Sequence, residues 1–313
     1  AKVPFSTRLR SDEGAAETLE EFFAQCEAAA PGNCAFAPDS ANRYDALAER
    51  LLESPIELPN PVTGGTETFR YQDLIGFSLG NLYNPFGYAD MAGGLAFFES
   101  IAFGTAPGAA PSPALMARLE ADPYDNFVES FPAVGCVDTT NPRSFRAWSR
   151  AGAAADAEFG YFGRIWTWAS SPCARWPFRD KDRFEGPFTA ETANPVLVIG
   201  NLYDPATRYE GAQTLRSLLP NSGLLTVDAP GHTSLGLSAC AGAITGLYFL
   251  DPATADAADG FTCPREYNAF DIVAGPPSAA AVGARSAGTD IEDMRMVRST
   301  VLPEAGLVPP VGG

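Results

Sequence analysis

The sequence predicts an α/β fold in which a large helical region precedes a small parallel sheet. Residues 195–199 and 223–227 are short, continuous apolar runs, as expected for strands that are buried on both faces of a parallel sheet. Residues 209–219, which lie between the two runs, have the character of a helix and complete a β-α-β unit. No long β-branched run occurs before residue 195, where helix signals dominate.

Three amphipathic patterns predict helices in the first part of the chain. Ser11 and Asp12 can cap the first helix, and Asn84-Pro85 should end the third, because a residue that precedes proline disfavours the helical conformation. Residues 55–65, rich in Pro and Gly, should break the chain between the second helix and the third. The apolar residues that share one face of each helix are Leu19, Phe22, Phe23 and Cys26, then Tyr44, Leu47, Leu51 and Leu52, then Tyr71, Leu74, Ile75, Leu79, Leu82 and Tyr83.

Charge and composition exclude two classes of partner. The chain has 21 basic and 38 acidic residues and a formal net charge of -17, which repels nucleic-acid phosphates and anionic membrane surfaces. We interpret this charge as a source of solubility. No apolar run reaches the roughly 18 residues needed to span a bilayer, and the N-terminus lacks the apolar core of a signal peptide. We therefore expect a soluble chain that is already processed or incomplete.

The cysteines favour disulfides over a metal site. Six cysteines are present without a CxxC pair, and the one histidine cannot complete a zinc site, so neither a metal nor a cofactor is expected. Cys26 with Cys34 and Cys240 with Cys263 would close short loops flanked by Gly or Pro, as in proteins of an oxidising compartment. Buried free thiols are the alternative.

Each predicted strand is followed by a residue suited to acid–base catalysis. Asp204 follows the first strand and His232 the second, and catalytic groups of an open parallel sheet lie at the carboxyl ends of its strands. A carboxylate that accepts the Nδ1 proton of a histidine fixes its tautomer, so the two residues are candidates for a triad acid and base. Asp228 is a rival acid, and Asp204 could instead cap a helix or form an Asp-Pro turn. We expect Gly200 and Gly231 to help the chain turn there.

Several segments together resemble the C-terminal region of secreted bacterial tripeptidyl aminopeptidases and related α/β-hydrolases. The resemblance covers roughly residues 15–265. The segments that carry it are FFAQCEAAAPGNCAFA, YQDLIGFSLGNLYNPFGYADMAGGL, WTWASSPCARWP, NPVLVIGNLYDPATRYEGAQTL, LLTVDAPGHTSLG and SACAGAITGLYFL.

The resemblance implies an α/β-hydrolase fold, secretion, and catalytic roles for two residues. In that family the position of Asp204 is the triad acid and that of His232 the triad base. The implied disulfides pair Cys26 with Cys34, Cys136 with Cys173, and Cys240 with Cys263. Residues 1–190 would form a helical lid, 191–273 the C-terminal part of the hydrolase core, and 274–313 a loosely held tail.

One part of the family pattern is missing. The nucleophilic serine and the oxyanion-hole loop of such hydrolases precede the lid. In this chain the expected lid starts at residue 1, so neither part stands ahead of it. We therefore expect the chain to begin just past the sixth strand of the fold, and the serine to lie on another polypeptide or to have been lost. The expected partner is the N-terminal polypeptide of the same hydrolase.

The chain does contain one motif that resembles a nucleophile elbow, and we expect it to be unrelated to catalysis. Residues 76–80 satisfy G-x-S-x-G, the pattern of a nucleophile elbow around Ser78. An elbow requires a buried strand directly before the serine, whereas residues 71–83 keep helical spacing. We interpret Ser78 as a lid-helix residue.

These observations predict a secreted serine hydrolase that releases short peptides from free N-termini, as tripeptidyl or prolyl-type aminopeptidases do. Esterase or amidase activity on small molecules is an alternative, and so is an inactive fragment that acts as a complementation or binding module. Glu129 or Glu158 could bind the amino terminus of a substrate. Four aromatic residues could either line the substrate pocket or form the core of the lid, and they are Tyr161, Phe162, Trp166 and Trp168.

Overall fold

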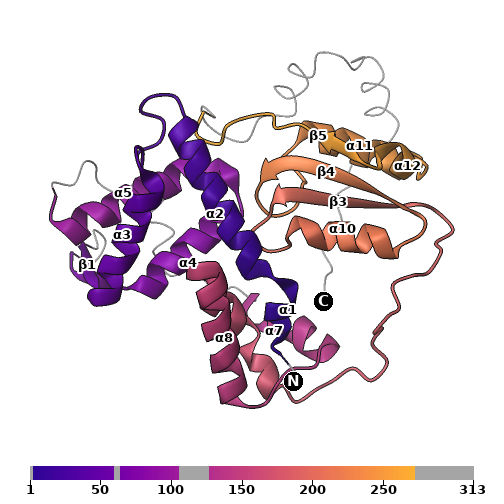
Figure 1. Ribbon diagram of the computed structural model, residues 1–313, viewed down its shortest axis with the longest axis horizontal. Helices are drawn as coiled ribbons and strands as arrows, with labels where there is room; N and C mark the ends of the chain where they lie inside the picture. Colours follow the sequence, from indigo (N-terminus) through magenta and orange to yellow (C-terminus); the bar gives the residue numbers. More distant parts are fainter. Residues whose placement is uncertain (1–2, 60–63, 106–126, 272–313) are drawn as a thin grey trace, which may run out of the picture. The chain divides into compact units, whose positions relative to one another are not determined.

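The computed structural model describes residues 3–59, 64–105 and 127–271, in which a helical region is followed by a small parallel sheet (Figure 1). The three helices predicted from amphipathic spacing are present. The helices of this region are α1 (Phe5–Leu9), α2 (Ser11–Ala28), α3 (Ser40–Glu53), α4 (Tyr71–Leu82), α5 (Tyr88–Phe103), α7 (Phe127–Asp138), α8 (Phe145–Phe159) and α9 (Gly163–Ala169).

The faces predicted from sequence form the core of the helical region. Phe22 of α2, Tyr44 of α3 and Leu74 of α4 have no exposed surface and belong to one apolar cluster. The start of α2 differs from expectation, because no side chain caps it. The hydroxyl of Ser11 instead donates to the carbonyl of Ala206, 2.5 Å away and far along the chain. This serine therefore ties α2 to the loop after the first strand of the sheet.

A β-hairpin begins in residues 55–65, which were expected only to break the helices, and ends just after them. Strands β1 (Ile56–Pro59) and β2 (Thr66–Phe69) pair antiparallel, with Ile56 opposite Phe69. Both of these side chains are buried. These strands were not predicted because each has only four residues, and such short strands give little apolar–polar alternation to detect.

The sheet has three parallel strands in the order β3-β4-β5. The two predicted strands are confirmed as β3 (Val196–Tyr203) and β4 (Ser222–Pro230). The third strand, β5 (Phe261–Cys263), was not predicted from the sequence. Helix α10 (Tyr209–Leu218) lies against one face of the sheet, and α11 (Ala239–Leu250) and α12 (Thr254–Ala258) lie on the other side (Figure 1).

Two glycines allow the helices to approach the strands closely. A Cβ atom at Gly200 of β3 would lie 2.8 Å from the ring of Tyr209 and 2.9 Å from the Cβ of Ala212 on α10. A Cβ atom at Gly223 of β4 would collide with the backbone of Ala255 on α12. The predicted role of Gly200 in a turn was therefore wrong, since Gly200 lies within β3 and is needed for helix packing.

All three predicted disulfides are confirmed. The Cα–Cα distances are 5.3 Å for Cys26–Cys34, 4.8 Å for Cys136–Cys173 and 5.6 Å for Cys240–Cys263. The last of these joins α11 to β5. The predicted tail over residues 274–313 lies outside the described residues. Among the helices of the described ranges, none combines the length and the apolar character required to cross a bilayer.

Candidate active site

Asp204 and His232 meet at the carboxyl ends of two neighbouring parallel strands. Asp204 directly follows β3 and His232 follows β4 after one glycine. The strand ends are joined by a hydrogen bond of 2.9 Å from the amide of Gly231 to the carbonyl of Tyr203. As a result, Nδ1 of His232 lies 3.0 Å from each carboxylate oxygen of Asp204.

The carboxylate of Asp204 is buried and fully surrounded by donors. Its exposed fraction is 4%. One oxygen accepts from the amides of Ala206 and Thr207, each at 2.8 Å, and the other accepts from the hydroxyl of Thr207 at 2.9 Å. The Asp-Pro turn considered as an alternative role is thus combined with the contact to His232. These bonds fix the direction in which the carboxylate presents its oxygens.

The contact between Asp204 and His232 shifts the pKa of both side chains. Burial would raise the pKa of Asp204, but hydrogen bonds from His232 and from the amides of Thr207 and Ala206 outweigh it and lower the pKa below its ordinary value. The hydrogen bond that His232 donates to Asp204 raises the pKa of His232 above its ordinary value, against the opposing effect of burial. The arrangement therefore favours an ionised acid beside an imidazole that is a stronger base than a free histidine.

The loop that carries His232 depends on a glycine. Gly231 has a φ of 110°, in the region that L side chains rarely adopt. A Cβ atom there would also lie 2.8 Å from Pro85 and 3.0 Å from the carbonyl of Tyr83. Gly231 therefore serves both the turn and a close contact with the end of α4.

Tyr83, at the end of α4, contributes to the site although sequence reasoning did not single it out. Its carbonyl accepts from the amide of His232 at 2.9 Å, and its ring packs edge-on to the imidazole at 5.2 Å between centroids. Burial, with the charge of Asp204, raises the pKa of Tyr83 to about 12. The helical region thus holds one side of the imidazole. No sequence signal could identify this contact, since it depends on how α4 packs against the loop.

The two competing candidates lie elsewhere. Asp228 is bound by Arg265, at 2.7 and 3.1 Å, and makes no hydrogen bond with His232 among the described residues. Ser78 has no exposed surface and lies within α4, where its hydroxyl donates to the carbonyl of Leu74 and accepts from Tyr44. Strand β2 does precede α4, but it belongs to an antiparallel hairpin and ends nine residues before Ser78. An elbow serine would instead stand at a sharp strand-to-helix turn.

The aromatic residues considered for a pocket pack in the helical core. Phe162 is fully buried and Trp166 is 9% exposed, and both belong to the main apolar cluster. The ring of Tyr161 packs against Tyr44, and Trp168 stacks on Trp148. Glu158 is paired with Arg10 at 3.4 Å. The side chain of Glu129 lies outside the described residues.

The described residues offer no grouping suited to a metal ion. Every cysteine is in a disulfide, and His232 is the sole histidine. Across the described ranges, no three His, Cys, Asp or Glu side chains gather as metal ligands. The described residues of this site supply an imidazole and a carboxylate.

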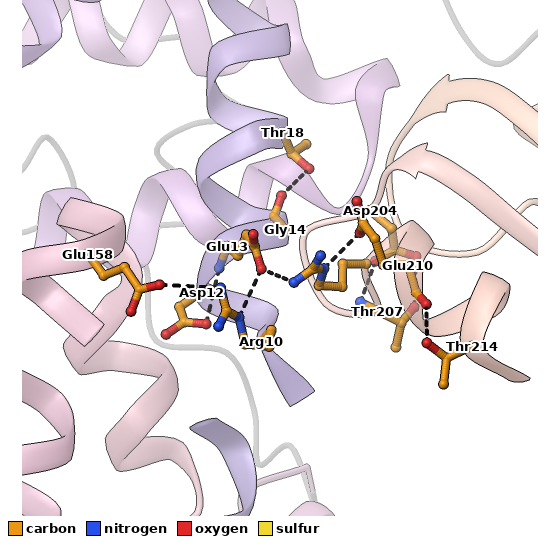
Figure 2. Close-up of polar contacts among 11 residues, drawn as sticks. Arg10, Asp12, Glu13, Gly14, Thr18, Glu158, Asp204, Thr207, Glu210 and Thr214 are labelled. Carbon is orange, nitrogen blue, oxygen red and sulfur yellow. Dashed lines mark hydrogen bonds and ion pairs between the residues drawn. The ribbon is translucent and has the colours of Figure 1, made fainter. Parts of the chain in front are cut away.

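The N-terminal turn of α2 supports the loop that carries Asp204. Figure 2 shows Glu13 and Gly14 of α2 beside this loop. Glu13 forms an ion pair with Arg208, whose side chain is only 17% exposed, and a second with Arg10. A Cβ atom at Gly14 would lie 2.5 Å from the carbonyl oxygen of Asp204. This close approach requires glycine at position 14.

We expect Gly14→Ala to destabilise the protein by about 1–3 kcal/mol, because the added methyl group must displace the backbone of Asp204. Gly93→Ala on α5 is the matched control, since a Cβ atom there meets nothing within 4 Å. That control should gain up to about 1 kcal/mol from helix propensity. Urea unfolding followed by tryptophan fluorescence measures both. Equal stability of the two variants would contradict the close approach.

Comparisons with known proteins place the two residues inside a matched segment. Residues 157–263 match the family described as "TAP-like protein". A tripeptidyl aminopeptidase of Streptomyces lividans is 28% identical over 150 residues, which cover 47% of this chain and 25% of that protein. A tripeptidyl aminopeptidase of Streptomyces coelicolor is 32% identical over 111 residues, covering 34% of this chain and 20% of that protein. The matches thus span about a quarter or less of those relatives.

Proposed function

The chain belongs to the TAP-like α/β-hydrolases through residues 157–263, and from this membership we propose that it supplies the acid and the base of a Ser-His-Asp triad. Asp204 is the proposed acid and His232 the proposed base. The observation that carries the proposal is the contact of both Asp204 oxygens with Nδ1 of His232, each at 3.0 Å. The serine of this triad lies outside the chain in our proposal.

The geometry suits proton transfer from a serine hydroxyl. Asp204 accepts a hydrogen bond from Nδ1–H, so the lone pair of the neutral ring is on Nε2. Nε2 has no hydrogen-bond partner among the described residues, and the His232 side chain is 32% exposed. A serine hydroxyl placed at Nε2 would lose its proton to the ring as it attacks a carbonyl carbon, and the ring would return that proton to the leaving group.

The sheet offers a place for the part that carries the serine. Among the described residues, β3 pairs only with β4, so its other edge presents unpaired backbone groups. Helix α10 beside it has no buried residue, and Leu215 and Leu218 are 39% and 40% exposed. A cavity of about 470 Å³, lined by residues of β3 and α10 together with Asp204 and Thr207, opens at this edge.

We propose that an N-terminal polypeptide of the same hydrolase adds strands along β3 and delivers its serine to His232. Helices flank both faces of this sheet, yet β3 keeps partly exposed apolar residues such as Leu197 and Ile199, whereas the strands inside a parallel sheet are normally buried. The division that we propose is a lid over residues 1–190, which ends before the sheet, and a core part over 191–273. The cavity beside β3 is lined in part by Asp204, which supports a catalytic site where the proposed polypeptide would meet this chain.

The proposed reaction is the release of short peptides from free N-termini. Two relatives that match the chain are tripeptidyl aminopeptidases, and the same triad chemistry would also cleave small esters and amides. The three disulfides favour an oxidising compartment, so we propose that the protein is secreted. A module without activity, which binds the N-terminal part only, is the remaining candidate.

A panel of three substrates tests this reaction on the native protein with its partner. The panel contains a tripeptide aryl amide, its N-acetylated form and an aryl acetate. We expect the free peptide to exceed the acetylated one in kcat/KM by about 10²-fold or more, because a site that pairs with a charged amine rejects a substrate without it. Cleavage of the acetate with no peptide hydrolysis would establish the esterase instead, and no turnover of any substrate would favour the inactive module.

A further inference from the structure

Asn201 of β3 holds the backbone on both sides of His232. Its side chain is 4% exposed. The amide nitrogen Nδ2 donates to the carbonyl of Gly231 at 2.9 Å and to the carbonyl of Thr233 at 2.7 Å. The side-chain amide thus donates to the carbonyls of the two residues on either side of His232. Tyr203, Tyr83 and Asp204 accept from the amides of this segment, and Asn201 binds its carbonyls at Gly231 and Thr233.

Asn201 binds a backbone segment whose conformation is unfavourable by itself. Gly231 has a φ of 110° and Thr233 a φ of 67°, so the chain enters the left-handed region on both sides of His232. For a β-branched residue such as Thr233, this conformation costs about 1–3 kcal/mol and persists only where surrounding contacts enforce it. The two bonds from Asn201 are among the contacts that enforce it, together with the amide of Thr233, which donates to Asp204 at 3.3 Å.

We infer that Asn201 is a positioning residue, which keeps His232 aligned with Asp204 by fixing the carbonyls of Gly231 and Thr233. The inference rests on the proposed function of this pair. Asn201 itself touches neither ring nor carboxylate in the described contacts, and its Oδ1 is buried without a hydrogen-bond partner there. Its amide therefore acts through donation alone. Any side chain of similar size that lacks a donor should release the loop.

The single histidine of the chain makes the alignment measurable without enzymatic activity. In the native protein, with ¹³C-histidine introduced into this chain, NMR titration should give a pKa of His232 above its ordinary value of about 6.5. Asn201→Leu and Asn201→Ala should bring it back toward about 6.5, because the ring leaves Asp204. Asn221→Leu is the matched control, since the amide of Asn221 also donates to a backbone carbonyl, that of Thr192 at 2.8 Å, before β4 begins.

A double substitution separates positioning from general loosening. Asp204→Asn should lower the pKa of His232 in the native background and change it little in the Asn201→Leu background, because the contact is already lost. An equal effect of Asp204→Asn in both backgrounds would overturn the inference. Failure of both Asn201 variants to fold, while Asn221→Leu folds, would also overturn it by making Asn201 a folding residue. These outcomes are independent of peptide hydrolysis, so they do not depend on the proposed reaction.

Discussion

Replacing His232 by Ala in the native enzyme should lower kcat by about 10⁴- to 10⁶-fold with little change in KM, because the base that takes the serine proton is removed. Asp204→Asn should lower kcat by about 10⁴-fold, since an amide cannot hold the imidazole in the required tautomer. The hydrogen bonds that the side chain at this position accepts from the amides of Ala206 and Thr207 should let the Asp204→Asn variant keep its fold. Steady-state kinetics on a chromogenic peptide amide measures all of these changes.

The pH dependence of the same enzyme should follow the pKa of His232. Asp204 raises that pKa, and only the neutral ring can accept a proton, so kcat/KM should fall as the pH drops through a value above about 6.5. Asp204→Asn removes the contact that raises the pKa, so its residual activity should fall at a lower pH. A profile that does not move between the two proteins would show that Asp204 does not control the base.

Ser78→Ala is the matched control for these substitutions, since Ser78 belongs to the G-x-S-x-G motif but lies inside α4. The variant deprives the Tyr44 hydroxyl of its acceptor, at a cost of about 1–3 kcal/mol of stability. Its turnover should remain close to that of the native enzyme, because no contact joins Ser78 to His232 among the described residues. Loss of turnover in a folded Ser78→Ala protein would falsify our interpretation of the motif.

The sequence was sufficient for elements with a strong pattern. Strand β3 and strand β4 were found because apolar runs such as Val196–Ile199 are typical of a parallel sheet, and α2, α3 and α4 because their buried faces repeat at helical spacing. Strand β5 has three residues, of which two are exposed, so it gives no apolar run to detect. The hairpin of β1 and β2 was not predicted either, because its strands have only four residues each.

The candidate site was predictable only where it depends on strand ends. Asp204 and His232 were found because the loops after parallel strands meet at one edge of a sheet. The sequence could not exclude Asp228, because its side chain is taken by Arg265 through tertiary packing. Nor could it identify Asn201 or Tyr83, whose contacts with the His232 loop depend on strand register and on the packing of α4.

We predict that the nucleophile of the proposed enzyme lies on a separate polypeptide, because β3 has an unpaired edge in the sheet that the described residues form. We expect a fluorophosphonate probe to label an N-terminal polypeptide in the native complex and not this chain, since labelling requires an activated serine beside a base and an oxyanion hole. The described residues of this chain supply the base and its acid only. The complex is labelled, its chains are separated under reducing conditions, and the adduct is located by mass.

The probe should react more slowly with a complex that carries Asp204→Asn, which ties labelling to this site. An adduct on Ser78, or stable folding with peptide hydrolysis by the isolated 313-residue chain, would contradict the split-hydrolase proposal. The exposed edge of β3 and the apolar residues of α10 would then need another partner or none.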